Sequence, residues 1–136
     1  KDGTIIYIKQ SLLKDPVNLI ATMAHELAHY ILLGEGRMET NDEYLTDLVA
    51  LSYGFGIFLG NTRFNFGRFS NVQGQGWEMS SQGYLPEQVI AYTMAWLAVY
   101  RNEEPFWKTL LNKDMLKYFD QSLEYITANP DKIKFE

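Results

Sequence analysis

Apolar side chains recur along the chain with two periods, which predict different elements. The segment Thr4–Ile8 is short, β-branched and aromatic, as is typical of a strand. From Pro16 to about Leu33 the apolar positions recur with the period of a helix instead. Asp15 supplies an N-cap, Pro16 fits the first helical position, and Gly34 offers a stop. The sequence therefore predicts an N-terminal strand followed by a long amphipathic helix.

The predicted helix has two chemically different sides. At 100° per residue, its larger apolar side chains gather on one side, at Ile20, Met23, Leu27 and Ile31. His25, Glu26 and His29 fall on the opposite side. We therefore expect the apolar side to pack into the core and the polar side to face a site.

A second helix and a β-hairpin are predicted next. The helix is expected to begin near Thr40 or Asn41 and carries a second set of apolar positions, at Leu45, Leu48, Val49 and Leu51. Arg63–Phe66 and Trp77–Ser80 are candidate strands of the hairpin, in a stretch rich in Gly, Asn, Gln and Ser. This hairpin would add to the β component of the fold.

The C-terminal part is predicted to be helical. Pro86 and Glu87 open a helix that runs to about Tyr100. Shorter helices near Pro105–Leu111 and Asp114–Thr127 are expected to close the domain. The predicted class is α+β and mainly α, in a single domain over residues 1–136. Because the first residue is Lys1 and not Met, we expect this domain to be a fragment of a longer chain.

Composition excludes several classes of function. The chain has 17 acidic and 12 basic residues, which argues against a nucleic-acid partner. It has no cysteine, so disulfides, thiolate metal sites and cysteine nucleophiles are excluded. There is no leader pattern and no apolar run of about 18 residues, so we expect no membrane partner. Together with the lack of cysteine, this favours a cytoplasmic location.

One motif carries specific chemistry. His25-Glu26-Leu27-Ala28-His29 places two imidazoles one helical turn apart, where both can bind one Zn²⁺ ion. Glu26 would lie beside the water on that ion and act as the general base in hydrolysis. The motif lies within a predicted amphipathic helix and on its polar side, which is the context that this chemistry requires.

The residue inventory limits the third ligand to oxygen. His25 and His29 are the only histidines and there is no cysteine, so a third protein ligand must be oxygen, for which the carboxylate of Asp or Glu is best suited. The nearest candidates are Glu35, Glu39, Asp42, Glu43 and Asp47. Glu43 and Asp47 lie four residues apart on the second predicted helix and share a face, so one can bind the metal while the other accepts a hydrogen bond from a ligand histidine.

The motif with Glu43-Tyr44-Leu45-Thr46-Asp47 resembles the gluzincin metallopeptidases and the small bacterial ImmA/IrrE-type peptidases. The resemblance covers about the first 55 residues and implies a minimal zincin-like domain. It implies Glu43 as the metal ligand and Asp47 as the residue that orients a histidine. Thr46 stands where the ImmA/IrrE-type family usually has Ala. The interval from His29 to Glu43 is short for the larger gluzincins, so the reverse assignment, with Asp47 on the metal, stays open.

The predicted function is that of a zinc-dependent peptidase with a peptide or protein substrate, which would add to an edge strand around Ile6 and Ile8. The alternative is a non-catalytic or regulatory zinc-binding domain that binds a partner segment. Tyr84 is a candidate donor to the oxyanion, and Arg37 a candidate for binding a substrate carboxylate. For both residues a structural role is also open, as a half-buried core tyrosine and as a solvated loop arginine.

Overall fold

The computed structural model describes residues 3–63 and 84–133, and these residues contain helices and no strand. The predicted α+β class is therefore wrong for the part of the chain described, which is all-α. The candidate hairpin strand Trp77–Ser80 and most of Arg63–Phe66 lie outside these residues, and Arg63 itself ends a helix. A membrane-spanning helix, which would have to be long and apolar, is not found among the described residues.

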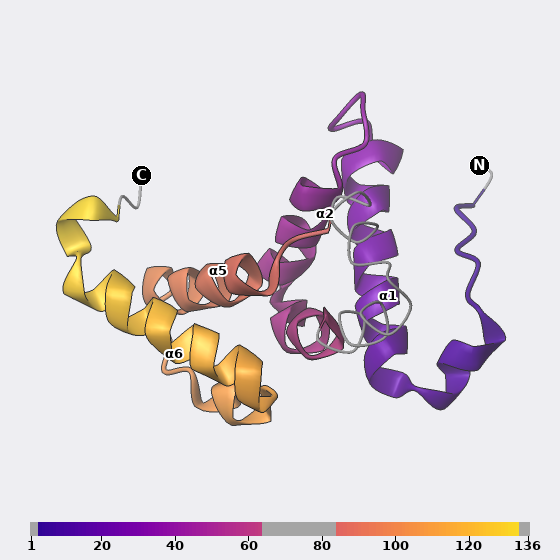
Figure 1. Ribbon diagram of the computed structural model, residues 1–136. Coiled ribbons are helices and arrows are strands. Elements are labelled where there is room, and N and C mark those ends of the chain that lie inside the picture. Colours follow the sequence, from indigo (N-terminus) through magenta and orange to yellow (C-terminus); the bar gives the residue numbers. More distant parts are fainter. Residues whose placement is uncertain (1–2, 64–83, 134–136) are drawn as a thin grey trace, which may run out of the picture.

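The predicted N-terminal strand does not form. Ile5 is 70% exposed and Tyr7 is 89% exposed, and the segment has no regular secondary structure. A strand needs a neighbouring strand to pair its N–H and C=O groups, and the described residues supply none. In Figure 1 this segment runs from the N-terminus to a short 3₁₀ helix, η1 (Gln10–Lys14), that precedes α1. The edge strand expected to bind substrate is therefore missing from the described residues.

Helix α1 (Pro16–His29) begins as predicted. Asp15 caps it by accepting a hydrogen bond from the Asn18 backbone N–H at 3.2 Å, and Pro16 occupies the first turn. The helix continues as a π-helical turn, η2 (Tyr30–Gly34), and Gly36 then takes a φ of +70°. This left-handed conformation is easiest for glycine, so the helical path ends close to the predicted position.

The buried side of α1 differs from the predicted one. Met23 and Leu27 are 37% and 44% exposed, whereas the buried residues are Ala21, Ala24 and Ala28. These alanines belong to the main apolar cluster of the protein. Helix α1 packs against α2, and small side chains such as alanine let two helices approach closely. The polar side of the helix therefore lies next to its packing interface, and the larger apolar side chains lie outward.

Helix α2 (Glu43–Ala50) begins two or three residues later than predicted, because Asp42 is its N-cap and accepts from the Leu45 N–H at 3.0 Å. It continues as a π-helical turn, η3 (Leu51–Phe55), and as a helix over residues 56–63. Gly54 has a φ of +97° and breaks this path. At Gly56 an added Cβ would lie 2.5 Å from the sulfur of Met94, so glycine allows the close approach of α5.

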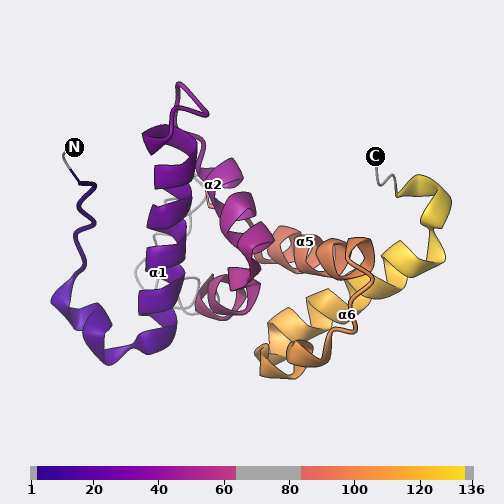
Figure 2. The same ribbon diagram turned by 180° about the vertical axis from the view of Figure 1, so that it is seen from behind.

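The C-terminal part is helical as predicted. It contains α5 (Glu87–Tyr100), the 3₁₀ helix η4 (Phe106–Leu110), α6 (Lys113–Ala128) and the short η5 (Pro130–Lys132). Helices α5 and α6 pack side by side, and Figures 1 and 2 show this pair at one end of the molecule, with α1 and α2 at the other. The fully buried side chains of the pair include Ile90, Met115, Phe119 and Ile126.

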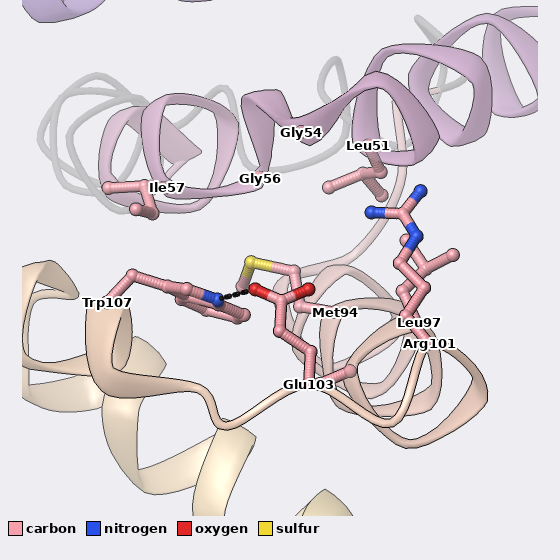
Figure 3. A pocket seen from close by; sticks show the side chains of 10 residues that line it. Leu51, Gly54, Gly56, Ile57, Met94, Leu97, Arg101, Glu103 and Trp107 are labelled. Carbon is pink, nitrogen blue, oxygen red and sulfur yellow. Dashed lines mark hydrogen bonds between the residues drawn. The ribbon is translucent and has the colours of Figure 1, made fainter.

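A cavity of about 210 Å³ lies between the Gly54 break, α5 and η4. Figure 3 shows Met94 and Trp107 on its wall, with the Trp107 indole N–H donating to Glu103 Oε1 at 2.7 Å. It shares no lining residue with the cavity beside the two histidines that is described below. The candidate site lies among α1, α2, residues 56–63 and the segment just before α5.

Candidate metal centre

Two histidines of α1 turn the same nitrogen toward each other. His25 Nε2 and His29 Nε2 are 3.0 Å apart, and the rings are nearly perpendicular, with an interplanar angle of 87°. This follows from the helix, since residues four apart lie on one face. Both rings are only partly exposed. The arrangement leaves two nitrogen atoms pointing at one region of space.

Glu43, the first residue of α2, brings a carboxylate to the same region. Its Oε2 lies 3.0 Å from His25 Nε2 and 3.4 Å from His29 Nε2. A tetrahedral Zn²⁺ ion with ligands at about 2.0–2.1 Å holds those ligands about 3.3–3.4 Å apart. The three atoms are therefore spaced almost as the ion requires. Asn41 Nδ2 donates to the other oxygen, Oε1, at 2.7 Å and so holds the carboxylate in this orientation.

Asp47 lies on the opposite side of the His25 ring. Its carboxylate is fully buried, and Oδ1 is 2.9 Å from His25 Nδ1. Its other oxygen accepts from Arg63 Nη2 at 2.6 Å and from the Leu85 backbone N–H at 3.1 Å. With all of these partners on its oxygens, Asp47 is directed at the back of the ring. Of the two assignments left open by the sequence, this geometry favours Glu43 as the ligand and Asp47 as the residue that orients His25.

These hydrogen bonds determine which nitrogen of each ring is free. An ionised carboxylate can only accept, so a neutral His25 ring that is bonded to Asp47 carries its proton on Nδ1 and keeps a lone pair on Nε2. Thr46 Oγ1 donates to the Asp42 carbonyl at 2.8 Å and can therefore accept from His29 Nδ1, which is 3.4 Å away. In both neutral rings the Nε2 lone pair then faces Glu43. A convergence of three lone pairs is stable only around a cation, either a proton or a metal ion.

The electrostatics of His25 agree with this arrangement. Burial by itself would lower the pKa of His25, because it disfavours the charged ring. The hydrogen bond and negative charge of Asp47 act in the opposite direction, with smaller contributions from Glu43 and Glu26, and the net effect raises the pKa. The surroundings of His25 therefore stabilise positive charge at this position, whether a proton or a metal ion carries it.

A cavity of about 160 Å³ opens beside His25. Glu26, Arg63 and Tyr84 line it, together with further residues of α1 and of residues 56–63, namely Asn18, Ala21, Thr22, Leu59 and Thr62. Glu26 thus lies on α1 next to His25 and faces a space that could accept part of a substrate. The cavity walls are mixed, with both apolar and polar side chains.

Tyr84 lies at this cavity, just before α5. Its ring centroid is 5.6 Å from that of His25, and the Arg63 guanidinium carbon lies 4.2 Å from the Tyr84 ring centroid on its face. Burial raises the pKa of Tyr84, the positive charge of Arg63 acts against this, and the nearby acidic residues act in the same direction as burial, so that the net effect raises the pKa. The hydroxyl therefore keeps its proton at neutral pH and can act as a hydrogen-bond donor.

Arg37 is not part of this cluster. It follows α1 in an exposed turn, where its guanidinium donates to Glu35 Oε2 at 2.7 Å and 3.0 Å. Its side chain is 60% exposed. The structure therefore places Arg37 as a loop arginine paired with its neighbour, which is the structural alternative considered for it.

Three contributors could not be identified from the sequence. Arg63 was expected in a strand but ends the helical stretch 56–63 and bonds to Asp47. Asn41 holds Glu43, and Thr46 contacts His29. Of these three residues, only Thr46 stood out in the sequence, because the ImmA/IrrE-type family usually has Ala at this position. To predict the role of Arg63, one would have to know that it lies close to Asp47 in space. The spacing of the two residues along the chain does not show this.

Comparisons with models of protein families, with curated proteins and with solved structures found no match to this chain. The function is therefore argued from the geometry of the site. Among the described residues, one group of three or more potential ligands is close enough to hold a metal ion, and it consists of His25, His29 and Glu43. This group coincides with the three residues that the sequence motif and its resemblance selected.

Proposed function

We propose that this protein is a zinc-dependent peptidase in which His25, His29 and Glu43 hold the metal ion. The observation that supports this most is the spacing of the three ligand atoms, at 3.0, 3.0 and 3.4 Å, beside a cavity that Glu26 lines. The donor set of two imidazoles and one carboxylate leaves a fourth position open, as catalytic zinc sites do. Other divalent metals accept the same donors, so metal analysis is part of the test.

The proposed roles of the residues follow from their positions. When bound, zinc would make a water molecule more acidic and polarise the carbonyl of the substrate. Glu26 would serve as the general base, taking a proton from the attacking water and delivering it to the leaving amine. Tyr84 keeps its hydroxyl proton and is placed to donate a hydrogen bond to the oxyanion. Asp47 holds His25 in the required tautomer.

The first test replaces the general base. Glu26→Gln keeps the size of the side chain and should keep about one equivalent of zinc, but hydrolysis should fall by about 10²–10⁴-fold. Cleavage is measured by mass spectrometry on a library of random peptides, with zinc measured by elemental analysis. Glu35→Gln is the matched control, since Glu35 lies in the exposed turn and pairs with Arg37. Cleavage by Glu26→Gln at the parental rate would contradict the proposal.

A non-catalytic zinc domain that binds a partner segment is the second candidate. One observation favours it: the described residues contain no strand to which an extended peptide substrate could pair. It predicts zinc near one equivalent with no cleavage of any library peptide by the parent protein. The same two measurements therefore separate the two functions, and absence of bound metal would contradict both.

A further inference from the structure

Arg63 is a charged residue in an unusual position. It is only 9% exposed, and its buried Nε–H has no hydrogen-bond partner among the described residues. Burying a guanidinium is costly unless its charge is compensated. The compensation is Asp47, which is fully buried and accepts from Arg63 Nη2 at 2.6 Å. The pair is therefore held in a fixed geometry inside the protein, unlike an exposed ion pair.

The two oxygens of Asp47 are divided between two tasks. Oδ1 faces His25 Nδ1 at 2.9 Å, and Oδ2 accepts from Arg63 and from the Leu85 N–H at 3.1 Å. The donors to Oδ2 thus prevent the carboxylate from rotating about its last bond. The position of Oδ1, and with it the orientation of the His25 ring, depends on what holds Oδ2. Of the two groups that donate to Oδ2, Arg63 is the one that carries a charge.

The contacts of Arg63 connect separate parts of the chain. Arg63 belongs to residues 56–63, Asp47 to α2, and His25 to α1. On its other face the guanidinium lies over the ring of Tyr84, which precedes α5. A movement of Arg63 would therefore be transmitted to the metal ligand through one carboxylate.

We propose that Arg63 is a positioning residue of the metal centre. It acts through Asp47 to hold His25 so that Nε2 points at Glu43 and His29. This inference rests on the proposed metal site but not on hydrolysis. Arg63 does not contact the three proposed ligand atoms, and in this proposal it does not contact the substrate. It affects the geometry and the affinity of metal binding.

The test measures zinc affinity by competition with a chromophoric chelator. Arg63→Met removes the charge at similar length, and we expect a 10–100-fold weaker affinity, as for other residues that support metal ligands. Arg63→Lys should lose less, because an ammonium can still reach the carboxylate as a point charge. Arg101→Met is the matched control, because Arg101 is exposed and donates to the Ser52 carbonyl away from the site. An Arg63→Met affinity within twofold of the parent would overturn the proposal.

A second comparison separates a positioning role from a general structural one. If Arg63 acts through Asp47, then Arg63→Met should change zinc affinity less than twofold in an Asp47→Asn background. Additive losses would overturn the proposal. The visible spectrum of the Co²⁺-loaded protein should also change in Arg63→Met and recover in part in Arg63→Lys. Should Arg63→Met fail to fold, Arg63→Lys decides: a loss of threefold or more supports the proposal, and an affinity equal to that of Arg101→Lys overturns it.

The outcome is distinguishable from failure of the peptidase proposal. A parent protein that binds zinc but cleaves nothing leaves the role of Arg63 intact and removes only the catalytic function. The imidazole nitrogen signals of the metal-free protein provide a readout without zinc or substrate. We expect His25 to carry its proton on Nδ1 in the parent and to exchange between tautomers in Arg63→Met. Identical tautomer signals in the two proteins would overturn the proposal.

Discussion

The two ends of the molecule bury different kinds of side chain. The buried residues of α5 and α6 are all apolar and include large side chains, among them Ile90, Met115 and Phe119, beside alanines of α5. Between α1 and α2 the buried residues are alanines together with Thr46 and Asp47. The α5–α6 pair is stabilised mainly by burial of apolar surface, which does not require a bound ion. The α1–α2 end depends on charges that must be compensated, so its stability should depend on metal ions.

The largest expected effect breaks the apolar end. Phe119 is fully buried, and its ring packs against Trp107 with centroids 5.2 Å apart. We expect Phe119→Ala to lower the free energy of unfolding by about 3–5 kcal/mol, from lost burial and the cavity left behind. Urea titration followed by circular dichroism measures this. Zinc affinity of the folded protein should stay at the parental value, because Phe119 lies on α6 whereas the proposed ligands lie on α1 and α2.

Phe106→Ala is the matched control for this change. Phe106 lies in η4 and is 82% exposed, so its removal should alter stability by no more than about 0.5 kcal/mol. If Phe119→Ala were as mild as Phe106→Ala, the view of α5 and α6 as the main apolar core would be wrong. If it weakened zinc binding strongly, the two ends could not be treated as separate.

The second prediction concerns the α1–α2 end. At a free zinc concentration about 100 times its dissociation constant, the parent should gain about 2.7 kcal/mol in free energy of unfolding. Glu43→Ala, which removes one of the three proposed ligand groups, should lose most of this gain. Unfolding is measured with zinc and with a chelator. Glu39→Ala is the control, because Glu39 is exposed and precedes α2.

Hydrogen exchange shows where that gain arises. Zinc should slow amide exchange mainly in α1 and α2, with little change in the local openings of α5 and α6. Equal protection of both ends would contradict the comparison and would indicate that the protein opens as one cooperative unit.

The sequence predicted local features well, because they depend on neighbours along the chain. The Asp15 cap, Pro16 at the first turn of α1, and the helix opening after Pro86 all act within a few residues. The strand at Thr4–Ile8 failed because a strand depends on a partner elsewhere. The hydrophobicity of the side chains in this segment does not specify such a partner strand.

The candidate site was predictable in part for the same reason. His25, Glu26 and His29 lie on one turn of helix, so spacing alone placed them together. Glu43 and Asp47 shared a face, but their roles depended on how α2 packs against α1. That packing uses Ala24 and Ala28, not the larger side chains whose periodicity had indicated the buried face. The role of Arg63 depends on its contact with Asp47, which lies 16 residues away in the sequence, and no periodicity predicts such a contact.

The smallest expected effect gives the sharpest comparison, because the same chemistry occurs at both ends. Asp42 caps α2 by accepting from the Leu45 N–H at 3.0 Å, and Asn112 caps α6 by accepting from the Met115 N–H at 2.9 Å. Changing either residue to Ala should lower the free energy of unfolding by about 1 kcal/mol. Only Asp42→Ala should also weaken zinc binding, by a few-fold, because the first residue of α2 is Glu43. Urea titration and chelator competition on the two variants measure both quantities. Equal zinc affinities in the two variants would mean that Glu43 is held by Asn41 and its own packing, and that the start of α2 contributes nothing to the site.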